Sequence, residues 1–125
     1  LIFVDLPGYG FARVPRAVQD EWRVLIEHYL SGRRGLRAVV VIVDVRRGVQ
    51  DADAALLDFL DAQGVEAILV ATKIDKLKPA EVEKVYAETE AAAKKRAAAF
   101  PLIHATSSEK LAGLEDLRAE IAGLL

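Results

Sequence analysis

The segment RAVVVIVDV, residues Arg37–Val45, decides the fold. Its run of valine and isoleucine is typical of a strand that is buried on both faces, as in a parallel sheet. Similar apolar segments predict three more strands, at Leu1–Asp5, Glu66–Thr72 and Phe100–Ala105. A helical pattern follows each of the four segments, so we expect the strands to be parallel.

Helical periodicity marks the segments that follow these strands. The first helix ends at Ser31-Gly32, and its apolar positions are Val18, Trp22, Leu25, Ile26, Tyr29 and Leu30. Further helices are expected at 51–63, stopped by Gly64, and from Pro79 to about Ala99. A last helix, 114–125, should turn four residues inward: Leu114, Leu117, Ile121 and Leu124. Alternating strands and helices predict an α/β fold with three layers, α/β/α, and a mostly parallel sheet with right-handed crossovers.

The composition indicates one domain with an apolar core. Of the 125 residues, 53% are apolar and 29% are charged, and the absence of cysteine excludes disulfides and thiolate metal sites. The net charge of −2 does not suggest a protein that coats nucleic acid through its overall charge. Residues 1–50 nevertheless carry eight arginines against five acids, so a local basic patch is possible.

The start of the chain is abrupt. There is no methionine, and the sequence opens within the apolar segment Leu1–Val4, so we interpret it as truncated; a processed N-terminus is the alternative. The longest apolar run, 38–43, is far shorter than the about 20 residues that cross a bilayer. No signal peptide opens the chain. We expect a cytoplasmic protein with no membrane partner.

The first motif, Asp5-Leu6-Pro7-Gly8, follows the first expected strand. A carboxylate at a strand tip can orient Mg²⁺ through water. A glycine three residues later lets its N–H approach a terminal phosphate. The same four residues also form ordinary turns, so the motif alone leaves both interpretations open.

The second motif, Thr72-Lys73-Ile74-Asp75, follows another buried strand. An ionised carboxylate only accepts hydrogen bonds, and guanine offers two adjacent donors that adenine cannot present as a pair. The lysine stem can lie along the base while its ammonium stays in water. The alternative is a capped loop before the helix that opens at Pro79.

A third motif, Thr106-Ser107-Ser108, follows the last expected strand. Its small residues let backbone N–H groups approach a base carbonyl, although serine-rich loops are common. Ligands bind at the carboxyl ends of strands in such sheets, and Asp5, Asp44, Thr72 and Thr106 are expected there. The order of the three motifs in one α/β chain is therefore more informative than any of them alone.

Together these motifs resemble the EngB/YihA subfamily of translation-factor-like P-loop GTPases. The matching segments are DLPGYGFARV at 5–14, DVR at 44–46, TKIDKLK at 72–78 and SSEKLAGLEDL at 107–117, with Trp22, Tyr29-Leu30, Arg33, Asp51 and Asp53 between them. Most GTPases carry asparagine where this chain has Thr72, and the threonine looks like a variant of the subfamily.

The resemblance implies a protein that binds GTP or GDP with Mg²⁺, hydrolyses GTP slowly and acts as a monomer in the assembly of the bacterial large ribosomal subunit. The family is also linked to cell division and septation. By motif match, Asp5, Leu6, Pro7 and Gly8 would face the γ-phosphate, with Asp5 toward the metal. Two further segments would hold the base: Thr72, Lys73, Ile74 and Asp75 would read guanine, and Thr106, Ser107 and Ser108 would close over it.

The sequence departs from this family because it has no phosphate-binding loop GxxxxGK[ST] and no Gly-Lys pair. The threonine switch that precedes the first strand in the family is missing too. The family's fold places this loop before Leu1, after a strand between those at 1–5 and 37–45. We expect residues 1–125 to be the C-terminal two-thirds of one G domain that lacks its first strands, and to bind GTP poorly alone. Tyr9 stands where Ras-like enzymes orient the attacking water with glutamine, so hydrolysis should be slow.

Two other functions stay open. One is a module that binds the ribosome or ribosomal RNA through the arginines of the first half, without nucleotide turnover. The other is a different doubly wound enzyme, such as a receiver domain that uses Asp5 and Asp44. The paired motifs after the later strands argue against it.

Overall fold

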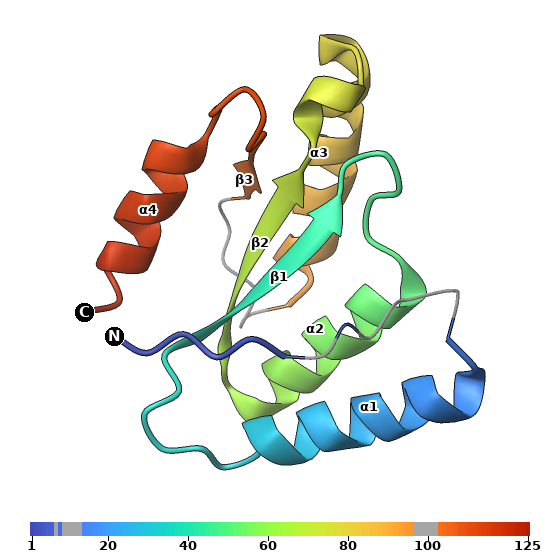
Figure 1. The fold of residues 1–125 in the computed structure, drawn as a ribbon, viewed down its shortest axis with the longest axis vertical. Helices are drawn as coiled ribbons and strands as arrows, with labels where there is room; N and C mark the ends of the chain where they lie inside the picture. The colour runs from blue at the N-terminus through green and yellow to red at the C-terminus, as the bar shows by residue number, and fades with distance from the viewer. Residues whose placement is uncertain (7, 9–13, 97–102) are drawn as a thin grey trace. The chain divides into compact units, whose positions relative to one another are not determined.

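The computed structural model describes residues 1–6, 8, 14–96 and 103–125 (Figure 1). Their contacts separate two compact units, 1–36 and 37–125, and each is described by itself. Pro7 and Tyr9 lie outside the described residues. That both units belong to one domain remains a prediction.

The first unit contains one helix, α1 (Arg16–Leu30), among its described residues. It begins after Pro15 and ends at Ser31, whose hydroxyl donates a hydrogen bond to the Glu27 carbonyl at 2.7 Å. The predicted helix is therefore confirmed. Ile26 and Leu30 are buried as its periodicity predicts, but Leu25 is exposed.

The strand predicted at Leu1–Asp5 is wrong. Residues 1–6 have no regular secondary structure, and the apolar side chains there are exposed, Ile2 at 88%. A strand is stable only when a neighbouring strand pairs with its backbone groups, and no described strand pairs with this segment. An apolar run of four residues was not sufficient to define one.

The second unit is an α/β arrangement around a parallel sheet (Figure 1). Its elements are β1 (Ala38–Asp44), α2 (Asp51–Gln63), β2 (Glu66–Thr72), the short 3₁₀ helix η1 (Ile74–Lys76), α3 (Pro79–Lys94), β3 (His104–Ala105) and α4 (Leu114–Ala122). The strands pair in the order β1-β2-β3, and both pairs are parallel. The predicted α/β class and parallel sheet are confirmed, with three strands rather than four among the described residues.

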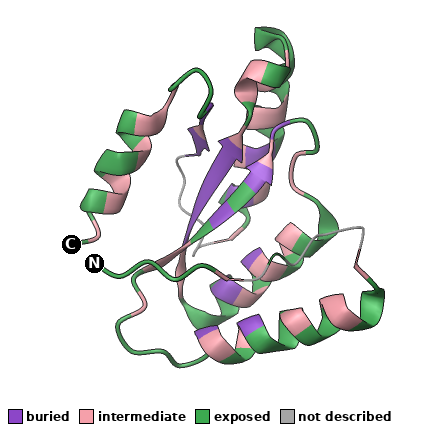
Figure 2. Cartoon of the chain, in the orientation of Figure 1, coloured by how far each residue is buried: buried purple, intermediate pink, exposed green. Residues whose placement is uncertain are grey.

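The core of this unit is centred on β2 (Figure 2). Five consecutive residues, Ala67 to Ala71, are buried, and alternate residues of a strand point to opposite faces. Both faces of β2 are therefore covered, as the predicted three-layer arrangement requires. Leu57 and Leu60 of α2 are also buried.

Strand β1 differs from the prediction of a strand buried on both faces. Val41 and Val43 are buried, but Ile42 on the opposite face is 62% exposed, and Val40 is exposed too. β1 is one of the two edge strands of the described sheet. A continuous apolar run does not by itself show that both faces of its strand are covered.

The other predicted elements are close to those observed. Helix α3 begins at Pro79 as expected and ends at Lys94, and residues 97–99 of the prediction lie outside the described residues. Strand β3 contains only His104 and Ala105, and residues 100–102 again lie outside them. Within the described ranges, no helix is long and apolar enough to cross a membrane.

Candidate functional site

Two loops meet at the carboxyl end of the sheet, and they carry the second and third motifs. In the parallel register Asp44 lies opposite Thr72, and Ala71 lies opposite Ala105, so β1, β2 and β3 end at the same edge. The Thr106 backbone N–H extends this pairing by donating to the Ala71 carbonyl at 2.7 Å. The polar residues that follow β2 and β3 are therefore brought together, as the sequence predicted.

The loop after β2 turns sharply at Lys73. This residue has φ of 62°, in the left-handed region that non-glycine residues seldom adopt. The turn lets the Ile74 N–H donate to the Thr106 carbonyl at 3.2 Å, and the Lys76 N–H donates to the Lys73 carbonyl at 2.9 Å. These bonds join the β2 loop to the β3 loop and form η1, which carries Asp75.

The start of α3 fixes the other end of this loop. Pro79 occupies the first turn of the helix, where a missing N–H costs nothing. The Glu81 carboxylate accepts a hydrogen bond from the Lys78 N–H at 2.9 Å, which caps the start of the helix. The capped loop that was the alternative to a guanine site is thus present.

Asp75 is held by Ser107. The Ser107 hydroxyl donates to Oδ1 of Asp75 at 2.7 Å, and the Lys110 N–H donates to the same hydroxyl oxygen at 3.1 Å. This serine hydroxyl lowers the pKa of Asp75 below its ordinary value of 3.8, against the opposing effect of desolvation. Asp75 is therefore an ionised carboxylate whose orientation is fixed.

Oδ2 of Asp75 has a weaker partner. The Lys76 ammonium lies 3.7 Å from this oxygen and 3.7 Å from Oε2 of Glu109. Both contacts are longer than a hydrogen bond, so they provide mainly charge attraction. An ionised carboxylate has about four acceptor positions, so Asp75 retains capacity for a ligand's donors.

The loop after β3 is fixed by backbone geometry. Ser107 and Ala112 exchange backbone hydrogen bonds at 3.1 and 3.0 Å, so the segment between them forms a closed turn. The Thr106 hydroxyl donates to the Ala71 carbonyl at 3.3 Å, which directs this side chain toward the sheet. Thr106 and Ser107 are buried, whereas Ser108 is exposed at the turn.

Gly113 closes this turn against the sheet. It has φ of 70°, and a Cβ added there would lie 2.1 Å from the Ala105 carbonyl oxygen. Only glycine fits both the conformation and the space. Gly113 therefore sets how closely the start of α4 approaches the end of β3.

A cluster of charges, which sequence reasoning did not predict, adjoins Lys73. The Asp44 carboxylate accepts hydrogen bonds from Nε of Arg46 at 3.0 Å and Nη2 at 2.6 Å, and from the Arg46 N–H at 2.9 Å. The Lys73 ammonium lies 3.3 Å from Oδ2 of the same carboxylate. The Arg46 guanidinium, foremost among these contacts, holds the pKa of Asp44 well below its usual range. The only signal in the sequence was the Asp44-Val45-Arg46 segment of the resemblance.

The remaining predicted site residues belong to the first unit. Asp5 and Gly8 are exposed, Leu6 is half-buried, and Pro7 lies outside the described residues. Among the residues that the structure describes, no three or more acidic, histidine or cysteine side chains form a group that could hold a metal. A Mg²⁺ ion at Asp5 would therefore depend on water and nucleotide oxygens for its other ligands, which is common for this ion.

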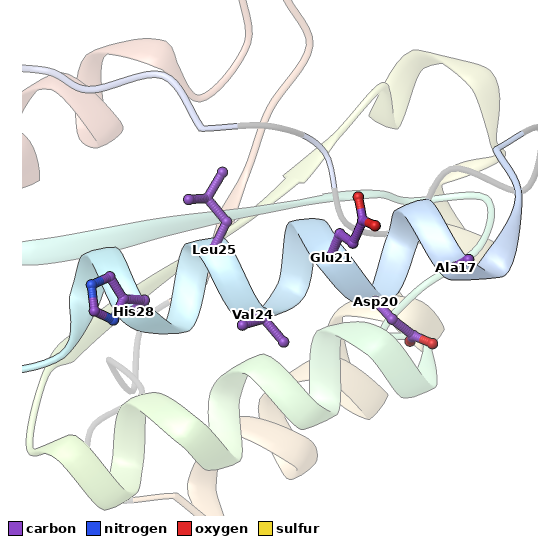
Figure 3. A pocket seen from close by; sticks show the side chains of 6 residues that line it. All are labelled: Ala17, Asp20, Glu21, Val24, Leu25 and His28. Carbon is purple, nitrogen blue, oxygen red and sulfur yellow. The ribbon is translucent and has the colours of Figure 1, made fainter.

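A shallow hollow lies along one helix, α1, and is unrelated to any of the motifs (Figure 3). Its lining is Ala17, Asp20, Glu21, Val24, Leu25 and His28. Three of these residues are apolar and two are acids, whose carboxylates would repel a phosphate. The sheet-edge site has the more specific chemistry.

Comparison with known proteins agrees with this geometry. Residues 26–124 match the family model described as the elongation factor Tu GTP-binding domain. The chain belongs to this family of nucleotide-binding α/β domains.

Relatives of the chain carry the name of the subfamily that the motifs resembled. The chain is 54% identical over 121 residues to a probable GTP-binding protein EngB of Caulobacter vibrioides, covering 97% of this chain and 53% of that protein. It is 53% identical over 125 residues to the probable GTP-binding protein EngB of Brucella melitensis, covering 100% of this chain and 52% of the relative. The chain thus spans about half the length of these relatives.

Solved structures support the fold. A crystal structure of a probable GTP-binding protein engB matches with a TM-score of 0.77 at 21% identity, covering 96% of this chain and 72% of that one. Elongation factor SelB from Methanococcus maripaludis, in its apo form, matches with a TM-score of 0.73 at 19% identity, over 97% of this chain and 24% of that one.

Proposed function

We propose that this chain supplies the guanine-recognising part of a GTP-binding site. The observation that carries the proposal is the Asp75 carboxylate, ionised and oriented by the Ser107 hydroxyl at 2.7 Å. Membership of the elongation factor Tu GTP-binding domain family and the EngB relatives, named as probable GTP-binding proteins, support it.

The chemistry follows from hydrogen-bond complementarity. Guanine's ring N–H and exocyclic amine would both donate to Asp75, replacing water on the carboxylate. Adenine has an acceptor where guanine has its ring N–H, so it would leave a largely covered charge unmatched, which is costly. The Lys73 stem would pack along one face of the base, and backbone N–H groups around Ser107 and Ser108 would approach the guanine carbonyl.

The phosphates and metal belong to a separate part of the proposal. Asp5 and Gly8 would face the γ-phosphate and Mg²⁺, and a bound Mg²⁺ would neutralise phosphate charge. Because these 125 residues contain no phosphate-loop motif, the base should provide most of the binding free energy. We therefore expect this chain to bind guanosine and GDP weakly and with similar affinity.

A titration of the ¹⁵N-labelled chain with nucleosides, followed by NMR, tests the proposal. Guanosine should bind in the millimolar range, and adenosine should bind at least tenfold more weakly, which corresponds to about 1.4 kcal/mol of discrimination. Asp58→Asn, which removes a surface ion pair on α2, is the matched control and should behave as wild type. Equal affinities for the two nucleosides would refute guanine recognition and favour a ribosome- or RNA-binding module without nucleotide use.

The wider role rests on the resemblance. We propose that the longer protein is a slow GTPase switch of the cytoplasm, monomeric, that acts in assembly of the bacterial large ribosomal subunit, with a link to cell division. Arg33, whose guanidinium lies 4.3 Å from the centre of the Tyr29 ring, is a candidate ribosomal RNA contact. Co-sedimentation with large subunits tests this, and binding that is unchanged by Arg33→Ala would exclude that contact.

A further inference from the structure

We propose that Asp44, held by Arg46, is a positioning residue for guanine binding that acts through the ammonium of Lys73. The inference rests on the proposed function and extends it to a residue on a different strand. Asp44 ends β1, whereas the guanine-reading segment follows β2. Lys73 joins the two through its 3.3 Å contact with Oδ2 of Asp44.

The backbone aims Lys73 at this partner. Its left-handed conformation is unfavourable for a residue with a side chain, so it is kept only if surrounding contacts stabilise it. Two hydrogen bonds from β2 to β1 do this at the preceding residue. The Thr72 hydroxyl donates to the Val43 carbonyl at 3.3 Å, and the Thr72 carbonyl accepts from the Val45 N–H at 3.0 Å.

Arg46 makes Asp44 a rigid anchor. A two-point guanidinium–carboxylate contact fixes the plane of the carboxylate as well as its position. Oδ2 then lies in one place and, with Oδ1, shares the negative charge of the carboxylate that attracts the Lys73 ammonium. The hydrogen bond to Asp44 raises the pKa of the Arg46 guanidinium above its ordinary value, and the charge of Asp75 adds a smaller contribution in the same direction.

The consequence for a ligand is steric and entropic. The Lys73 side chain is more than half exposed, and a lysine this exposed would sample many rotamers if it had no partner. Ordering such a side chain against a base costs free energy. An ammonium already tethered to Asp44 restricts the rotamers of the four-carbon stem before a base arrives. The stem then forms a preorganised wall for the face of a purine, while Asp75 reads its edge.

A double-mutant cycle on the 125-residue chain, measured as guanosine dissociation constants by NMR, tests the inference. Asp44→Asn removes the tether's charge, and Lys73→Met keeps the stem but removes the ammonium. Each should weaken guanosine binding about threefold to fivefold, the range of a partly exposed ion pair. Asp44→Asn in the Lys73→Met background should cause no further loss.

Inosine lacks the exocyclic amine of guanosine but has the same kind of ring face. It therefore distinguishes contacts to the face of the base from hydrogen bonds to its edge. Asp44→Asn should weaken guanosine and inosine by the same factor. Asp58→Asn removes a pair of 2.7 Å between α2 and Arg96 and should leave both affinities unchanged.

Several outcomes would overturn the inference. An Asp44→Asn loss of equal size in the wild-type and Lys73→Met backgrounds would mean that Asp44 supports the fold and does not act through Lys73. If Asp44→Asn does not fold, Lys73→Met decides alone, because Lys73 is exposed and an unchanged affinity contradicts the tether. If the wild-type chain shows no preference for guanosine, the proposed function fails first.

Discussion

Replacing Gly113 with alanine should destabilise the carboxyl end of the sheet more than the same replacement at Gly64 destabilises the fold. Two effects add at Gly113. The left-handed φ of 70° costs an alanine about 1 kcal/mol relative to glycine. The new methyl group would also lie 2.1 Å from the Ala105 oxygen, whereas real contacts are essentially never below 3.0 Å, so the backbone must move.

The clash with the Ala105 oxygen accounts for most of the expected loss of stability. Overpacking of this kind typically costs about 1–3 kcal/mol. The unfolded chain loses freedom with alanine, which returns about 0.5 kcal/mol. With the backbone strain included, Gly113→Ala should therefore lower the free energy of unfolding by about 1.5–3.5 kcal/mol.

Gly64→Ala is the matched control. Gly64 ends α2 with φ of 66°, but nothing lies within 4 Å of the Cβ that it would gain. Its cost should stay at or below about 1 kcal/mol, because only backbone strain remains. Urea unfolding followed by circular dichroism gives both values, and equal losses for the two variants would refute the close approach of Gly113 to β3.

Three further predictions concern the site and the core. Asp75→Asn should change the preferred nucleoside from guanosine to xanthosine, because an amide can donate to the carbonyl that xanthine has in place of the guanine amine. Titration with both nucleosides measures this preference, and a retained preference for guanosine would contradict the role of Asp75. Ser107→Ala should raise the pKa of Asp75 toward 3.8, because it removes the hydrogen bond that does most to lower this pKa. The wild type loses the stability that depends on the ionised carboxylate only as pH falls through the lowered pKa, so the variant should lose it at a higher pH. Carboxyl ¹³C shifts measure this titration, and an unchanged titration would contradict the prediction. Leu60→Ala should lower the free energy of unfolding in urea by about 2–5 kcal/mol, because Leu60 is buried. Ile42→Ala, on the exposed face of β1, should lower it far less, and similar losses for the two variants would contradict the burial of α2.

The juxtaposition of Asp75 and Ser107 could be predicted from the sequence. Two parallel strands end at one edge of a sheet, so polar residues after each of them must be close. The position of each motif directly after a strand was enough to predict that Asp75 and Ser107 lie close together. The direct hydrogen bond between them required the structure, since it depends on the turn at Lys73 and the closed loop from Ser107 to Ala112.

The failures have a common physical origin. Leu1–Asp5 and the outer face of β1 are apolar, but neither is buried as predicted, because strand pairing and burial depend on neighbours that a local pattern does not specify. The Asp44–Lys73 ion pair was missed for a related reason. It joins residues far apart in the sequence through a backbone conformation that no residue type required.

A chemical-shift map of the labelled chain during guanosine titration tests the central claim most directly. If the β2 and β3 loops form one base site, the largest shifts should fall within residues 72–76 and 105–110, and adenosine should not reproduce them. Shifts centred on the α1 hollow, residues 17–28, or the same shifts with adenosine, would contradict the account.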